Sequence, residues 1–192
     1  VPTLAGEFKQ KIAIVGGGPA GISCAFYLAE KGYKPTIFEK NDKLGGMVVY
    51  GIPSFVLEKD IVAAEIDILR EMGVEFKTGV EVGKDITLNQ LREDGYEALY
   101  IAIGCQGGRK INVPGEDADG VMTGVDFLHI TTDDENYKLA GDTVVIGGGN
   151  VAIDVSRSAV RCDSANVYQV SLETRDIMPA LPEEIELAES EG

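Results

Sequence analysis

The residues of this chain that most clearly indicate chemistry lie in two glycine-rich segments. Residues 16–21 read GGGPAG and residues 147–152 read GGGNVA. Both fit the spacing G-x-G-x-x-G/A. In that spacing the first glycine allows a tight turn, the second lets a pyrophosphate approach the backbone, and the third position lets a helix pack on a strand. The helix that follows such a turn presents unpaired N–H groups and a positive dipole end to phosphate. The spacing therefore predicts two phosphate-binding turns.

An acidic residue follows each turn at the distance that a nucleotide site requires. Glu39 and Glu173 each come somewhat more than 20 residues after the first glycine of their turn, at the end of the next expected strand. A carboxylate in this place accepts hydrogen bonds from the ribose hydroxyls of a bound dinucleotide. A glycine-rich turn that serves packing alone is the alternative for each segment. Two such units in one chain favour a flavin site and a nicotinamide site, because hydride exchange needs both.

The elements around these turns alternate between strand and helix. Residues 11–15 and 34–39 read as buried strands on either side of a helix at 20–31. The same reasoning gives a helix at 58–72, strands at 74–78 and 98–103, a helical turn at 85–91, strands at 143–146 and 166–172, and helices at 150–161 and 182–190. This alternation predicts an α/β fold with doubly wound parallel sheets.

We expect two domains from this pattern. Residues 10–135 form a Rossmann-like FAD-binding domain that lacks its C-terminal part, and residues 140–192 form a second, incomplete Rossmann-like domain for the nicotinamide cofactor. Two strands are too few for a stable nucleotide domain, so the chain is expected to be truncated or shortened. The open sheet edge predicts dimerisation, strand exchange or disorder beyond about Asp142.

Composition excludes several classes of function. The formal charge of −15 opposes binding to nucleic acid or to an anionic membrane surface. The three cysteines have no CxxC spacing, which argues against a redox-active dithiol or an iron–sulfur cluster and favours the cytoplasm. We also expect no signal peptide, membrane span or metal site. No acid or base residue is assigned, because hydride transfer is chemistry of the cofactors.

Residues 12–46, reading IAIVGGGPAGISCAFYLAEKGYKPTIFEKNDKLGG, resemble the FAD half of the pyridine-nucleotide oxidoreductases. The continuation YGIP at 50–53 is similar to the glutamate synthase small-subunit group, whose relatives include the flavin part of dihydropyrimidine dehydrogenase. The segments TVVIGGGNVAIDVSRSAVR at 143–161 and MPALPEE at 178–184 are similar to the NADPH module of that group. The resemblance covers nearly the whole chain.

The resemblance implies an oxidoreductase that passes hydride from NAD(P)H to FAD and electrons to a partner subunit or an iron–sulfur protein. The residues that it and the glycine motifs assign to the cofactors are Gly16, Gly18, Pro19, Ala20, Gly21, Glu39, Lys40, Leu44, Gly45, Gly46, Val82 and Gly104 for FAD, and Gly147, Gly149, Asn150, Val151 and Glu173 for the nicotinamide cofactor. A homodimer is a further expectation.

Four departures from the family pattern qualify this interpretation. The upstream cysteine-rich iron–sulfur domain and the C-terminal return to the FAD domain are not present, and the FRLP that often follows YGIP is replaced by FVLE at 55–58. Leu172 and Glu173 stand where the family carries a basic pair for the NADPH 2′-phosphate, so NAD(H) is the predicted preference, although Arg175 lies close by.

Four alternative interpretations stay open. A disulfide reductase is opposed by the lone cysteines, and a flavin monooxygenase would not explain the second turn. A non-catalytic nucleotide-binding fragment is the rival from another class. A reductase module like that of dihydropyrimidine dehydrogenase is a fourth possibility within the family.

Overall fold

Four parallel strands form the sheet of the N-terminal part of the chain. In the computed structural model, which describes residue 2 and residues 5–192, they lie in the order β3-β2-β1-β4. The strands are β1 (Lys11–Val15), β2 (Lys34–Phe38), β3 (Glu75–Lys77) and β4 (Tyr96–Ile101). The order reverses between β1 and β4, and ligands of open α/β sheets bind beside the carboxyl ends of strands at such a reversal.

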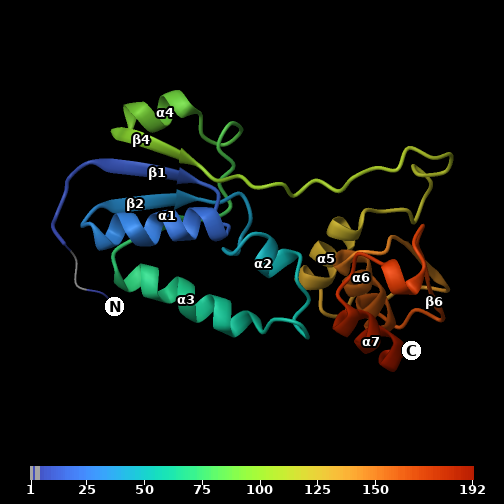
Figure 1. The fold of residues 1–192 in the computed structure, drawn as a ribbon. Coiled ribbons are helices and arrows are strands. Elements are labelled where there is room, and N and C mark those ends of the chain that lie inside the picture. The colour runs from blue at the N-terminus through green and yellow to red at the C-terminus, as the bar shows by residue number, and fades with distance from the viewer. Residues whose placement is uncertain (1, 3–4) are drawn as a thin grey trace. The chain divides into compact units, whose positions relative to one another are not determined.

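Helices cover both faces of this sheet, as the apolar strand runs predicted. The helices α1 (Pro19–Glu30) and α3 (Lys59–Glu71) share one core with the sheet, whereas α4 (Leu88–Glu93) packs on the opposite face (Figure 1). Neighbouring strand residues divide between the two cores because side chains alternate along a strand. Ile14 and Ile37 belong to the first core, and Ala13 and Phe38 to the second. The predicted doubly wound α/β fold is confirmed here.

A second sheet holds two parallel strands, β5 (Thr143–Ile146) and β6 (Val167–Val170), joined through α6 (Asn150–Arg161). Its core is built from β5, α6 and α5 (Gly124–Asp133). The last helix is α7 (Pro182–Glu191), whose Ile185 packs with Ile153 of α6. These strand and helix positions follow the predicted ones within one or two residues.

Some elements differ from the prediction. The helix α5 was not expected, and Thr123 begins it by accepting a hydrogen bond from the Asp126 N–H at 3.2 Å. A short helix, α2 (Met47–Tyr50), and a 3₁₀ turn at Arg175–Ile177 lie in segments for which no regular structure was predicted. The strand β4 begins two residues earlier than predicted, because α4 has ended before Gly95, whose φ is +86°.

The chain divides into two compact units. The first holds the described residues up to Val49 together with Ser54–Cys105, and the second holds Tyr50–Pro53 and Gln106–Gly192. The predicted first domain, 10–135, therefore spans the first unit from residue 10 and part of the second. Within the second unit, the Tyr50 ring stacks on His129 of α5 with 4.3 Å between ring centroids.

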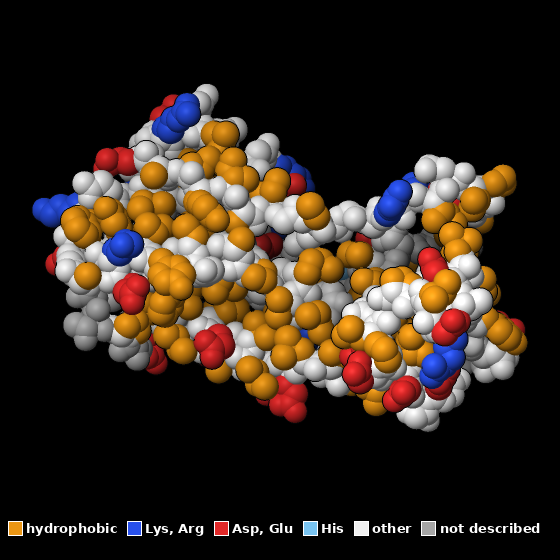
Figure 2. Space-filling model, viewed as in Figure 1, with side chains coloured by type: hydrophobic (Ala, Val, Ile, Leu, Met, Phe, Trp, Pro, Cys, Tyr) orange, Lys and Arg blue, Asp and Glu red, His pale blue; other side chains and the backbone are white. Residues whose placement is uncertain are grey.

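Apolar side chains remain exposed on both sheets, and Figure 2 shows many on one face of the protein. On β5 and β6 the residues that alternate with the core positions are exposed, namely Val144, Ile146, Tyr168 and Val170. On the edge strand β4, Leu99, Tyr100 and Ile101 are exposed as well. Within the described residues, no helix is both long and apolar enough to cross a bilayer.

Candidate nucleotide-binding turns

The first glycine-rich turn joins β1 to α1, and two of its glycines are required by the protein itself. Gly16 has φ +108°, and a Cβ atom built on it would lie 2.3 Å from the carbonyl oxygen of Ala102. A Cβ atom on Gly21 would lie 1.9 Å from the carbonyl oxygen of Gly16. Both positions therefore exclude any side chain, which explains these glycines by a tight turn and by close helix–strand packing.

Gly18 is different, because nothing in the protein requires a glycine there. Its φ of −79° and ψ of −177° suit any residue, and a Cβ atom would meet only the Cα of Gly46, at an ordinary 3.8 Å. Gly18 is also the residue before α1, and no side chain caps the N-terminus of that helix. Open space beside uncapped helix N–H groups suits a bound pyrophosphate.

Glu39 lies against this turn, directly after β2. It is only 4% exposed, and its Oε2 accepts a hydrogen bond from the Gly17 N–H at 2.7 Å. Its Oε1 accepts from the Asn41 N–H at 2.9 Å. Two backbone donors compensate the burial of the carboxylate and fix its position. Each oxygen keeps a further lone pair with which it can accept from a ribose hydroxyl.

A second segment crosses the same turn. The Gly45 N–H donates to the carbonyl oxygen of Gly17 at 2.7 Å, and a Cβ atom on Gly46 would lie 2.9 Å from the Cα of Gly18. Leu44 is buried in the core shared with α1. Residues 44–46 thus lie beside Gly18, as expected for residues that contact the same ligand.

The remaining predicted FAD residues surround this turn less closely. Pro19 and Ala20 form the exposed first turn of α1, and Lys40 is exposed after Glu39. Val82 is partly buried against the core beneath α4. Gly104 has φ +65° and open space around it, shortly after β4.

The second turn joins β5 to α6 and repeats the first in outline. Gly147 has φ +148° and donates its N–H to the carbonyl oxygen of Val170 at 2.8 Å. Gly149 has φ −94° and ψ 172°, and no atom lies within 4 Å of a Cβ built on it. Like Gly18, Gly149 is a glycine that packing does not demand, next to a helix N-terminus without a side-chain cap.

Gly148, in contrast, is enclosed by the segment that follows β6. A Cβ atom there would lie 3.0 Å from Oε2 of Glu173 and 3.1 Å from Cβ of Ser171. The carbonyl oxygen of Gly148 accepts from the Ala180 N–H at 3.0 Å. The Asn150 side chain accepts from the Leu181 N–H at 2.8 Å through its Oδ1. Val151 is exposed in the first turn of α6.

A network of charged side chains holds α7 on α6. Arg157 is 6% exposed and pairs with Glu184 at 3.1 Å and with Glu191 at 2.8 Å. Hydrogen bonds from Arg161 and Arg157 lower the pKa of Glu191 to about 2. Burial, reinforced by the charge of Glu184, raises the pKa of Asp154 to about 6, against the opposing effect of Arg157. The network anchors the helix that continues the segment across the second turn.

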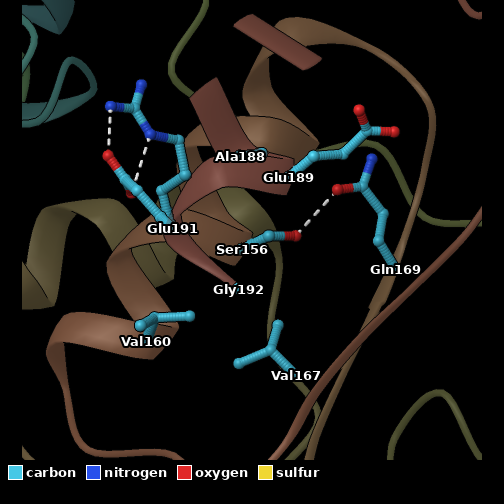
Figure 3. Close-up of a pocket in the computed structure, with 9 residues that line it drawn as sticks. Ser156, Val160, Val167, Gln169, Ala188, Glu189, Glu191 and Gly192 are labelled. Carbon is cyan, nitrogen blue, oxygen red and sulfur yellow. Dashed lines mark hydrogen bonds and ion pairs between the residues drawn. The ribbon is translucent and has the colours of Figure 1, made fainter. Parts of the chain in front are cut away.

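A cavity of about 180 Å³ lies beside this network. Its lining includes Ser156 and Gln169, which share a hydrogen bond of 2.9 Å, and the Glu191 side chain (Figure 3). None of the lining residues belongs to the second glycine-rich turn. The cavity adjoins that turn, because Gln169 donates its Nε2–H to the carbonyl oxygen of Gly147 at 3.1 Å.

Sequence reasoning missed several residues at these turns. Gly17, Asn41, Gly148, Ala180 and Leu181 all contact predicted site residues through backbone or side-chain atoms. The middle glycines could have been found, because a G-G-G run exceeds what the G-x-G spacing needs. Residues 180–181 lie in the segment 178–184 that resembles the NADPH module, but their contacts depend on a chain path across the turn that no local pattern specifies.

Comparison with known proteins matches the chain to one family. The family model described as pyridine nucleotide-disulphide oxidoreductase matches residues 10–191. The NADP(+)-dependent formate dehydrogenase subunit beta of Moorella thermoacetica is 44% identical over 99% of this chain and 27% of its own length. The glutamate synthase [NADPH] small chain of Escherichia coli K12 is 34% identical over 100% of this chain and 43% of its own length.

Solved structures give the same grouping. Mycobacterium tuberculosis FprA in complex with NADPH superposes with a TM-score of 0.77 at 25% identity, over 95% of this chain and 48% of FprA. The thioredoxin reductase of T. acidophilum has a TM-score of 0.66 at 19% identity, over 95% of this chain and 62% of that chain, a likeness that shows the fold alone. The chain spans less than half the length of the two curated relatives described above.

Proposed function

Because the chain belongs to the pyridine nucleotide-disulphide oxidoreductase family, we propose that it carries the two nucleotide sites of a flavin-dependent NAD(P)H oxidoreductase. FAD is assigned to the first turn, in the predicted domain 10–135, and the nicotinamide cofactor to the second, in the predicted domain 140–192. The family implies this pair of cofactors, which would supply the exchange of hydride between nicotinamide and flavin. The observation that carries the proposal is the pair Gly18 and Gly149, two glycines that the protein's own packing does not need.

In this proposal the residues of the chain bind and orient the two cofactors. The first turn receives a pyrophosphate at Gly18 and the N-terminus of α1, while Glu39 accepts hydrogen bonds from the ribose. The second turn receives the other pyrophosphate at Gly149 and the N-terminus of α6. Asn150 is held by Leu181, which fixes the side chain beside that site. No side chain is assigned to proton transfer.

We further propose that the second site prefers NAD(H). The relatives' names print NADP(+) and NADPH, but here Glu173 lies against the turn, with Oε2 3.0 Å from the place of a Gly148 Cβ. A carboxylate suits a ribose with two hydroxyls and repels a 2′-phosphate. Arg175, the nearby cation, forms two hydrogen bonds of 2.6 Å with Glu189. Because Glu189 already pairs with the guanidinium of Arg175, this guanidinium is directed away from a 2′-phosphate.

The cofactor preference is tested by the rate of flavin reduction with NADH and with NADPH under anaerobic conditions. NADH is expected to reduce the wild-type protein at least about tenfold more efficiently, since a like-charge contact costs more than 1.4 kcal/mol. Glu173→Arg should reverse the preference, and Glu189→Ala, which releases Arg175, should shift it partway. Faster reduction by NADPH in the wild-type protein would overturn the preference and leave the oxidoreductase assignment in place.

The proposed function as a whole is tested by the visible spectrum of the purified natural protein. A bound flavin band that bleaches on addition of NADH or NADPH is the expected result. A colourless protein that takes up no added FAD would support the rival interpretation, a non-catalytic nucleotide-binding module.

The electron acceptor is proposed to be a partner subunit or an iron–sulfur protein. The names "small chain" and "subunit beta" of two relatives support a multi-subunit setting. Homodimerisation is the other proposal, supported by the exposed apolar residues of β5 and β6. Light scattering of the purified protein, alone and mixed with the proteins encoded by neighbouring genes, distinguishes a partner subunit from a homodimer. The free state of Cys24, Cys105 and Cys162 supports our placement in the cytoplasm.

A further inference from the structure

One buried polar atom in the described part of the chain lacks a hydrogen-bond partner, and it lies beside the first turn. This atom is Nδ2 of Asn41, two residues after Glu39. A buried N–H group without a partner is costly, and native proteins seldom keep one without a reason. The amide of Asn41 therefore requires an explanation.

The backbone of Asn41 already performs the structural work at this position. Its N–H donates to Oε1 of Glu39 at 2.9 Å, and its carbonyl oxygen accepts from the Gly79 N–H at 3.1 Å. Val80 donates its N–H to the carbonyl oxygen of Glu39 at 2.9 Å. Asn41 is thus fixed where the Glu39 carboxylate meets the segment that leads to Val82. These bonds would survive replacement of the side chain, so folding leaves the amide group unexplained.

A bound adenosine would explain it. Ribose hydroxyls donate to a carboxylate such as Glu39, and their oxygens, like the ring nitrogens of adenine, still accept hydrogen bonds. The terminal torsion of asparagine is broad, so the amide can turn toward a ligand without moving the backbone. We propose that Nδ2 of Asn41 donates a hydrogen bond to the adenosine part of FAD, which makes Asn41 a binding residue of the first site. The inference rests on the proposed FAD site.

Two flavin ligands and one pair of variants test the inference. The full protein stripped of flavin is titrated with FAD and with FMN, which lacks the adenosine, for the wild type and for Asn41→Leu. Asn89→Leu, the same change on the exposed surface of α4, is the control. Asn41→Leu should weaken FAD binding about tenfold, the loss of one useful hydrogen bond, and leave FMN binding unchanged. Asn89→Leu should change neither.

The melting temperature of the flavin-free protein gives an independent readout. If Nδ2 serves only the ligand, Asn41→Leu removes an unpaired buried donor and should hold or raise the melting temperature. Asn41→Asp, which keeps the shape but offers no donor beside Glu39, should weaken FAD binding further. Asn41→Ala, which removes the donor with a smaller side chain than leucine, repeats both the affinity and the melting measurements.

The outcomes separate this inference from the proposed function. Wild-type affinity for FAD in Asn41→Leu, or a lower melting temperature of its flavin-free form, would overturn the role of Asn41 and leave the FAD site standing. An equal loss of FAD and FMN binding would also overturn it, because the effect would then not reside in the adenosine. A wild-type protein that binds no FAD would overturn the proposed function itself.

Discussion

The two glycine-rich turns of this protein follow the same backbone path. They differ in how closely the surrounding residues pack and hydrogen-bond against the turn. In each, the first glycine donates its N–H to the last residue of the next strand, Phe38 or Val170, at 2.8 Å. In each, the middle glycine's carbonyl oxygen accepts from a later crossing segment, at Gly45 in one unit and Ala180 in the other. The second turn is therefore a local structural repeat of the first, with residues 178–181 in the place of 44–46.

The acidic residues show the difference. Glu39 is buried and holds two backbone N–H groups. Glu173 is half-buried, and its carboxylate forms no hydrogen bond that is seen among the described residues. The comparison teaches that the proposed ribose acceptor of the first turn, Glu39, is fixed by the protein itself, whereas the proposed acceptor of the second turn, Glu173, can still adjust. A fixed acceptor suits a cofactor that stays bound, and an adjustable one suits a cofactor that exchanges.

The largest effect is expected at the third position of the motif, which is Gly21 in one turn and Ala152 in the other. Gly21→Ala places a Cβ atom 1.9 Å from a backbone oxygen and should destabilise the protein by at least about 3 kcal/mol. Ala152→Gly removes one methyl group and should cost about 1 kcal/mol, mainly through helix propensity. Urea unfolding of both variants measures the difference. Equal destabilisation would show that the two turns are closed to the same degree.

The next largest effect is expected when the same substitution, glutamate to glutamine, is made at Glu39 and at Glu173. Glu39→Gln turns an amide N–H₂ toward one of two backbone donors and should cost about 1–3 kcal/mol. Glu173→Gln removes no hydrogen bond of the folded chain and should stay within about 0.5 kcal/mol. Both are measured by denaturant unfolding of the flavin-free protein. A greater loss for Glu173→Gln would contradict the account of a fixed first and an adjustable second acceptor.

The smallest effect lies in the helices behind the turns. The helix α1 packs through an apolar core, whereas α6 carries the charged network with α7. The pKa of Asp154 rises from 3.8 to about 6, so the folded protein binds this proton more tightly than the unfolded chain. The contribution of Asp154 to stability is therefore full below about pH 4 and is lost as the pH rises through about 6.

Asp154→Asn removes the buried charge. The variant should be more stable than the wild type by about 1 kcal/mol at pH 7.5, a value reduced for the partial exposure of the group, and no more stable at pH 3.5. Thermal unfolding at the two pH values measures this. A gain that is the same at both pH values would show that the charge of Asp154 is not its source.

Much of this architecture could be predicted because it is encoded locally. The apolar run at 143–146 and the helix at 150–161 were predicted at their observed bounds, since a buried strand followed by a glycine turn leaves few alternatives. The helix α5 was missed because its sequence, GVDFLHITTD, is rich in β-branched residues, and its start depends on the Thr123 cap.

The sites show where local pattern stops being informative. The glycine spacing identified Gly16, Gly18 and Gly21 together, but only the folded structure separates the two glycines that the fold requires from the one that it leaves open. The pattern also identified Glu173, yet the pairing of Arg175 with Glu189 of α7 depends on the tertiary position of a helix. Asn41 carried no signal, because an unpaired donor is a property of its surroundings.

The central claim is that Gly18 and Gly149 are kept for two different dinucleotides. It is tested most directly by measuring the binding of FAD and of NADH to Gly18→Ala and Gly149→Ala, each with its melting temperature. The account predicts that both variants fold as stably as the wild type, that Gly18→Ala loses at least about tenfold in FAD affinity alone, and that Gly149→Ala loses as much in NADH affinity alone. Wild-type affinities in either variant, or one variant that weakens both ligands equally, would contradict it.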